Sequence, residues 1–430
     1  MRKLRACQRR AISIVVLLCA CSSLGMAYSV LAHEEIVDLV WQDQIQPLLL
    51  QRFPSATAND LRKAHAYAYG GSLIQDMGYY PFGNKYFSDM THYVRTGDFV
   101  EALLDDASDL NEYAFALGAL AHYASDNTGH PTINRVVAMD FPKLERRYGS
   151  VVTYEDDHSA HIRTEFGFDM VQVAKNRYSS DRYHDFIGFE ISKPLLDRAF
   201  QQTYGIPLTD VIHDQDLAFG TFRRAISKVI PEMTRVALLN RKADVVRDTP
   251  NFNKKEFLYR LSRTQYDKEW GKGYRRPGIG SRILAVILKI VPKVGPFKAL
   301  AFQVPTTQTE DMYIRSINQT VDDYRALLQQ QAKGDLHLAN LDLDTGRPSK
   351  AEEYQLADRT YDRLLDDLVK RDFNPLTPDL RTNMLSFYAV PQKPQSPKDE
   401  KAWQKAREQL AKLKEQTATQ PATAQPGDPR

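Results

Sequence analysis

The chain has 430 residues, of which 43% are hydrophobic and 26% are charged. These fractions are typical of a soluble globular protein, and they exclude a disordered chain, a collagen-like repeat and a polytopic membrane protein. The formal net charge is +3, but leaving out the five basic residues in the acid-free segment 1–27 changes it to −2, so the remainder has no overall attraction to nucleic acid.

Residues 1–27 follow the pattern of a secretory signal peptide, because basic residues precede the apolar run Ala11–Ala20 and small and polar residues follow it. Cleavage after position 27 would make Tyr28 the mature amino terminus, whereas cleavage after position 32 would leave His33. Lipid attachment at Cys21 and an uncleaved anchor are two alternatives, and residues 11–32 are just long enough to span a bilayer. We expect an exported protein, periplasmic or secreted, with a lipid-anchored form as the alternative.

All three cysteines lie in this segment, at positions 7, 19 and 21. A mature chain that begins at Tyr28 therefore contains no thiol, and it can use neither a disulfide nor a cysteine nucleophile. Any zinc in such a chain must be held by histidine, aspartate, glutamate or the amino terminus.

Helical periodicity dominates the rest of the chain and strand-like alternation is scarce, so we predict an all-α fold. The segment 110–126 is apolar nearly all round, which predicts a buried helix that begins at Asp109 and ends near Asn127 and Gly129. Further helices are predicted at 34–51, 57–76, 97–107, 159–176, 194–203, 218–241, 310–331 and 350–371.

The composition changes after about residue 250, and we expect a catalytic domain at 28–250, a helical C-terminal region of unassigned role at 251–390 and a flexible tail at 391–430. Lys289, Lys293 and Lys298 interrupt an apolar stretch. Such lysines suit transient contact with an anionic membrane surface, although lysines that extend from a packed helix give the same pattern.

Histidines concentrate in the first part of the chain, where seven of the ten precede residue 162. His122 and Asp126 are four residues apart on a predicted helix, so their side chains share a face, and His130 follows after four more residues. His161 and Glu165 form a second pair with the same spacing. The upstream candidates are His33, Asp76 and His92.

A single pair of this kind is more often a hydrogen-bonded structural pair than a metal site. Two such pairs on predicted helices are less readily explained in that way, because buried charges need partners that a dication can supply. Imidazole and carboxylate without thiolate suit zinc in a catalytic role. Gly118 and Ala119, one turn before His122, are small enough to leave room for an ion.

In order and residue type, these candidates resemble the ligands of the bacterial zinc-dependent phospholipases C, to which the fungal single-strand-specific zinc nucleases are related in fold. The resemblance covers roughly residues 28–250 and implies a multi-helix domain with three zinc ions in one cleft. The implied ligands of the first ion are Asp76, His92, His122 and Asp126. Those of the second are His130, His161 and Glu165. Those of the third are His33, Asp126 and the amino and carbonyl groups of Tyr28.

The resemblance also implies a reaction, the hydrolysis of a phosphodiester between diacylglycerol and its headgroup, with Asp76 as general base as well as ligand. Glu165 matches the phospholipase branch, since the nuclease branch more often has an aspartate there. An exported nuclease acting on nucleic acid is the alternative, and a non-catalytic binding protein on the same scaffold is a further one.

Three aromatic residues, Tyr79, Tyr80 and Phe82, follow Asp76. Beside the metals they would hold a choline headgroup or stack on a nucleobase, and otherwise they would pack in the core.

Overall fold

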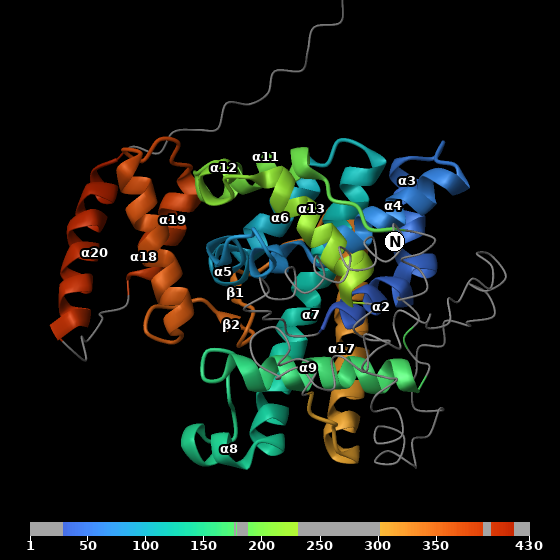
Figure 1. Ribbon diagram of the computed structural model, residues 1–430. Coiled ribbons are helices and arrows are strands. Elements are labelled where there is room, and N and C mark those ends of the chain that lie inside the picture. The colour runs from blue at the N-terminus through green and yellow to red at the C-terminus, as the bar shows by residue number, and fades with distance from the viewer. Residues whose placement is uncertain (1–28, 176–177, 179–187, 231–301, 390–396, 417–430) are drawn as a thin grey trace, which may run out of the picture.

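The computed structural model describes residues 29–175, 178, 188–230, 302–389 and 397–416 (Figure 1). Within these ranges the regular structure is helical except for one hairpin of two-residue strands, which confirms the predicted all-α fold. None of the helices in these ranges combines the length and the apolar character needed to cross a bilayer.

The first part of the chain forms, in order, α2 (Val30–Val40), the π-helical turn η1 (Trp41–Ile45), α3 (Gln46–Arg52), α4 (Ala58–Gly71), the 3-10 helix η2 (Ile74–Tyr79), α5 (Lys85–Tyr93), α6 (Thr96–Asp106), α7 (Leu110–Asp140), α8 (Pro142–Tyr148) and α9 (His158–Ala174). Next come α11 (Lys193–Tyr204), α12 (Leu208–Val211), α13 (Gln215–Arg224) and the π-helical turn η3 (Ala225–Val229). The last part contributes α17 (Thr307–Lys333), β1 (Leu341–Asp342), β2 (Arg347–Pro348), α18 (Gln355–Lys370), α19 (Pro378–Phe387) and α20 (Pro397–Glu415).

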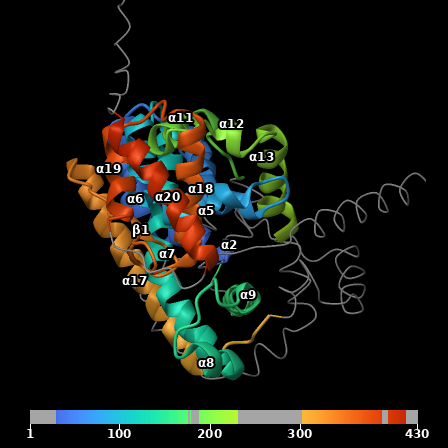
Figure 2. The same ribbon diagram turned by 90° about the vertical axis from the view of Figure 1, so that its left-hand side faces the viewer.

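Helix α7 runs through the middle of the molecule, and α17 lies alongside it in both views (Figure 1, Figure 2). The carboxylate of Asp109 caps its first turn by accepting hydrogen bonds from the backbone N–H groups of Asn111 and Glu112. The cap fixes where the helix begins, as the sequence predicts.

The predicted end of this helix near Asn127 and Gly129 is wrong, because α7 continues through Pro131 to residue 140. Proline inside a helix removes one backbone hydrogen bond and costs about 3 kcal/mol. Burial of residues after it, such as Ile133 and Val137, offsets this cost. Local stop signals are therefore overridden here by packing.

Glycines allow α4 and α7 to approach each other to backbone contact. A Cβ atom at Gly118 would lie 2.0 Å from the carbonyl oxygen of Ala68, and one at Gly71 would lie 1.9 Å from that of Phe115. Close-packed interiors cannot accept such overlaps without moving backbone. Helix α4 therefore fills the space beside Gly118, and the prediction that this residue leaves room for an ion is wrong.

Helix α2 is buried along its whole length and contacts α4, α7 and α17. The backbone N–H of Leu31 donates a hydrogen bond to the carboxylate of Asp169 on α9, with a nitrogen–oxygen distance of 3.1 Å. This bond joins the beginning of α2 to α9, so helices from distant parts of the chain meet beside α7.

Helix α17 and the hairpin of β1 and β2, both beyond residue 301, pack directly on these helices. The Tyr324 hydroxyl of α17 donates to the carbonyl of Leu117 on α7 at 2.8 Å. Strands β1 and β2 pair in antiparallel fashion, and the backbone N–H of Leu343 in their connecting turn donates to the carbonyl of His92 at 3.0 Å. The turn therefore lies against the end of α5.

Among the described residues, five α-helices lie outside the individually predicted segments, namely α5, α8, α12, α19 and α20, although α19 falls within the region 251–390 that is predicted to be helical. Helix α20 falls inside the segment expected to be a flexible tail, and it buries Leu410 and Leu413. The helix ends before the low-complexity residues 417–430 begin. Three parts of the sequence analysis lie outside the described residues: the segment 417–430, the lysines at 289, 293 and 298, and the end of the helix predicted at 218–241.

The close contact between α4 and α7 gives a stability prediction. Replacing Gly118 by alanine should lower the free energy of unfolding by about 1–3 kcal/mol, because the new methyl group forces the helices apart. Gly220→Ala on α13 is the matched control, since a Cβ there meets nothing within 4 Å. The control should be neutral or stabilising by up to about 1 kcal/mol. Urea unfolding followed by circular dichroism measures both, and equal midpoints would contradict the packing argument.

Candidate metal centre

The carboxylate of Asp126 on α7 is fully buried and surrounded by imidazole rings. Nε2 of His122 lies 3.1 Å from its Oδ2, and Nε2 of His92 lies 3.3 Å from the same oxygen. Nε2 of His130 lies 3.6 Å from Oδ2, and Nε2 of His33 lies 3.5 Å from Oδ1. One carboxylate therefore stands at the centre of four histidines.

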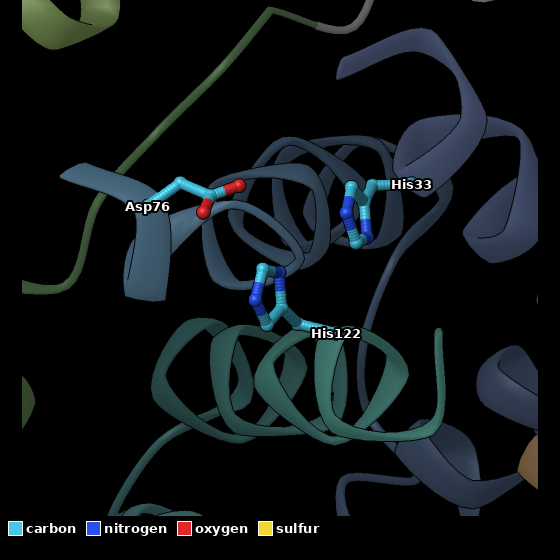
Figure 3. A group of neighbouring side chains, drawn as sticks. All are labelled: His33, Asp76 and His122. Atoms are coloured by element: carbon cyan, nitrogen blue, oxygen red, sulfur yellow. The ribbon is translucent and has the colours of Figure 1, made fainter. Parts of the chain in front are cut away.

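These side chains come from separate elements that converge on one face of α7. His122, Asp126 and His130 share that face because they recur every four residues along the helix. Asp76 enters from η2, with its Oδ1 3.5 Å from Nε2 of His92. Figure 3 shows His33, Asp76 and His122 pointing toward one another from three different elements.

Backbone carbonyls fix which nitrogen of two of these rings points inward. Nδ1 of His122 lies 2.9 Å from the carbonyl oxygen of Ser72, and Nδ1 of His92 lies 2.7 Å from that of Ser88. A carbonyl only accepts, so Nδ1 carries a proton in each ring and Nε2 of the neutral ring carries a lone pair. The two Nε2 atoms are 3.3 Å apart. A proton or a metal cation is needed to offset the repulsion between them.

Helix α9 adds the second predicted pair. Nε2 of His161 donates to the carbonyl of Val152 at 2.7 Å, which leaves its Nδ1 facing Oε1 of Glu165 at 3.4 Å. The centroids of the His161 and His130 rings are 6.4 Å apart, so this pair adjoins the group around Asp126.

The distances between donor atoms favour shared metal ions over simple hydrogen bonds. N–H···O hydrogen bonds measure about 2.7–3.2 Å. Two ligand atoms at about 2.0–2.2 Å from one tetrahedral zinc lie about 3.3–3.6 Å apart. Five of the six nitrogen–oxygen pairs among the predicted ligands lie at 3.3–3.6 Å, and the sixth, between His122 and Asp126, lies at 3.1 Å. Imidazole and carboxylate without thiolate also suit zinc, so the residues fit this metal.

Burial and mutual charge shift the pKa values in the cluster. Burial lowers the pKa of His161 to about 4, which keeps the ring in the neutral form that binds a metal. Burial raises the pKa of Glu165 well above its usual range. Burial lowers the pKa of His130 as well, but the neighbouring carboxylates of Asp344 and Asp126 outweigh it and raise the pKa to about 9. At pH 7 the metal-free cluster therefore holds protons.

Eight of the nine predicted ligands lie in this cluster, with exposed fractions of 0–3%, while Tyr28 lies outside the described residues. His65 lies elsewhere, with its Nε2 2.9 Å from Asp38 and its ring stacked on Trp41. His65 is therefore a hydrogen-bonded residue of the core.

Sequence reasoning missed two acidic residues. Asp344, in the turn between β1 and β2, places its Oδ1 3.3 Å from Nε2 of His130. Asp169, one turn after Glu165, binds the backbone of Leu31. A lone acid in a distant turn carries no spacing signal, whereas Asp169 extends the four-residue spacing of His161 and Glu165 and could have been found from it.

Only one of the three aromatic residues after Asp76 borders the cluster. The ring of Tyr79 lies 6.1 Å from that of His92, with both residues buried. Tyr80 packs edge-on against Phe222 in the core, and Phe82 is 59% exposed. Tyr80 is therefore a residue of the hydrophobic core, while Tyr79 borders the cluster.

Comparison with protein-family models matched residues 32–213 to the model described as zinc dependent phospholipase C. The match confirms the resemblance inferred from the sequence, and the family implies a zinc-dependent hydrolase. It includes every predicted ligand except Tyr28, and it ends well before Asp344. No curated protein and no solved structure matched the chain.

The central position of Asp126 predicts the effect of removing its charge. Asp126→Asn should lose at least one zinc ion per chain, measured by elemental analysis after mild purification, because the carboxylate adjoins four imidazole rings that are predicted ligands. Asp38→Asn is the matched control, since Asp38 is 1% exposed and contacts a histidine outside the cluster. The control should keep the wild-type zinc content. Equal zinc in both variants would rule out Asp126 as a ligand.

The shifted pKa values predict that zinc uptake releases protons. His130, with its pKa raised to about 9, and Glu165, with its pKa raised by burial, both favour the protonated form before metal binds. Both must lose a proton to become ligands, so zinc affinity should fall as pH falls. Titration of the chelator-treated protein at pH 7 in two buffers of different ionisation enthalpy measures the release. Zinc binding without proton release would contradict these protonation states.

Proposed function

From the zinc-dependent phospholipase C domain at residues 32–213, we propose that this chain is an exported zinc-dependent phospholipase C. Its reaction is hydrolysis of the phosphodiester between diacylglycerol and the headgroup of a phospholipid. The observation that carries the proposal is the pair of Nε2 atoms of His92 and His122, which face each other at 3.3 Å beside two buried carboxylates. A divalent cation offsets the repulsion between the two Nε2 atoms and the negative charge of the two carboxylates.

We assign the ligands to three ions as the family resemblance implies. The first set is Asp76, His92, His122 and Asp126. The second set is His130, His161 and Glu165, and the third is His33, Asp126 and the amino-terminal residue. Support for the first set comes from His92, His122 and Asp126, whose ligand atoms all lie within 4.8 Å of one another. Asp76 lies equally close to His122, in a group that also includes His33 of the third set.

A phosphodiester resists attack because its negative charge repels a nucleophile. Zinc, when bound, supplies positive charge that neutralises the phosphate oxygens and lowers the pKa of water from 15.7 toward about 7. The chain's own contribution is to hold the ligands rigidly. Backbone carbonyls orient the His92, His122 and His161 rings, so these ligands need no rearrangement when substrate binds.

Asp76 is the residue we assign as general base. Among the described residues, Oδ2 of Asp76 accepts no hydrogen bond, while Oδ1 faces His92. A carboxylate with one oxygen toward a metal ligand and one oxygen available can take the proton from an attacking water molecule.

The burial of α2 bears on the mature amino terminus. Residues 29–32 are 0–5% exposed, and the N–H of Leu31 binds Asp169. Cleavage after position 32 would remove these buried residues, whereas cleavage after position 27 would retain them and leave Tyr28 as the first residue. We therefore assign the free amine of Tyr28, with its carbonyl, to the third ion. Amino-terminal sequencing of exported protein tests this assignment, which a start at His33 would rule out.

Substrate assays test the proposed reaction. Purified protein should release a phosphorylated headgroup from phosphatidylcholine, lose this activity with a chelator and regain it with added zinc. Single-stranded DNA is the parallel substrate, and cleavage of DNA without cleavage of lipid would contradict the phospholipase assignment in favour of a nuclease. Cleavage of neither, with zinc bound, would favour a binding protein.

The role of Asp76 predicts a large loss of activity on substitution. Asp76→Asn should reduce turnover by about 10²- to 10⁴-fold, the range for loss of a general base. Asp89→Asn is the control, because Asp89 lies on neighbouring α5 and pairs with Lys85 outside the cluster. It should retain activity within a few-fold. Wild-type turnover in the Asp76 variant would remove this residue from the mechanism.

A further inference from the structure

The turn between β1 and β2 delivers a buried carboxylate to the metal centre from outside the family-matched segment. The Asp344 side chain is 3% exposed, and its Oδ1 lies 3.3 Å from Nε2 of His130. Its Oδ2 accepts hydrogen bonds from the hydroxyl groups of Tyr93 at 2.8 Å and Tyr354 at 2.5 Å. The two oxygens therefore have different environments.

The two phenols orient this carboxylate. Because both donate to Oδ2, the plane of the carboxylate is fixed and Oδ1 is directed at the imidazole of His130. Ligating carboxylates are commonly hydrogen-bonded in this manner.

The backbone of the turn is fixed to α7. The Asn134 side chain on α7 donates to the carbonyl of Asp344 at 2.9 Å, and the backbone N–H of Asp344 donates to the Asp342 carboxylate at 2.9 Å. Gly346 has a φ of +68°, and a Cβ there would lie 2.8 Å from the carbonyl oxygen of Asn127. Only glycine suits this position, so the turn is held tightly against α7.

We propose that Asp344 is a metal ligand that the C-terminal region adds to the group formed by His130, His161 and Glu165. The separation of 3.3 Å from His130 matches two ligands of one ion better than a charge-assisted hydrogen bond, which measures about 2.7–2.9 Å. Asp344 closes one coordination position, so this ion is held more tightly and carries less net charge. The inference rests on the proposed metal centre and extends it beyond residue 213.

Zinc binding by the full-length mature protein tests this inference. Wild type and Asp344→Asn are equilibrated at a series of fixed free-zinc concentrations, and bound zinc is measured by elemental analysis. Asparagine can still accept the two phenol hydrogen bonds, so the substitution removes mainly the anionic ligand. We expect one ion to bind at least about tenfold more weakly in the variant. Identical binding curves would overturn the proposal.

Asp342→Asn is the matched control, because Asp342 supports the same turn by accepting the N–H of Asp344. It should keep all bound zinc, and loss of the same ion in this control would show that turn integrity, and not ligation, is responsible. If Asp344→Asn does not fold, anomalous diffraction from crystals of the zinc-loaded wild type decides. An Asp344 oxygen at about 2.0–2.2 Å from a zinc ion supports ligation, and one farther than about 3 Å from every zinc overturns it. A wild type that binds no zinc defeats the proposed function itself.

Discussion

The buried carboxylate of Asp126 is the group on which the arrangement of this molecule depends. Four imidazoles approach it within 3.6 Å, and a charge at this depth is stable only if opposite charge compensates it. The fold supplies that compensation by bringing α2, α5 and α7 to one point. Protons provide it before metal binds, and a dication provides it afterwards. Metal affinity, protonation and helix packing are therefore aspects of one electrostatic requirement.

The part of this site that recurs along helices is readable from the sequence. His122, Asp126 and His130, and likewise His161 and Glu165, share a helix face because of their four-residue spacing. Assigning Asp76, His92 and His33 to the same site required the resemblance to a known family, since spacing alone does not connect separate elements. Asp344 could not be found, because its position depends on how a distant turn packs on α7.

Two interpretations failed because local patterns do not specify neighbours. Gly118 indicates a face of α7 that a neighbouring group can approach closely, but the sequence does not show that this neighbour is α4. Asn127, Gly129 and Pro131 are ordinary helix-ending residues, yet tertiary burial carries α7 past them. The carbonyls of Ser72, Ser88 and Val152 that orient the imidazoles are equally invisible in sequence, because a backbone group does not depend on residue type.

The turn that carries Asp344 makes completion of the site a late event in the life of the chain. Tyr93 and Asp344 are 251 residues apart, so the hydrogen bond between them closes a very long loop. Contacts of such high contact order form slowly and only after both partners have been synthesised. A ribosome-bound chain that ends before the hairpin already contains the helices with most of the ligands, but it lacks this carboxylate. Under the proposed ligation by Asp344, full zinc loading requires the hairpin to be synthesised and packed on α7.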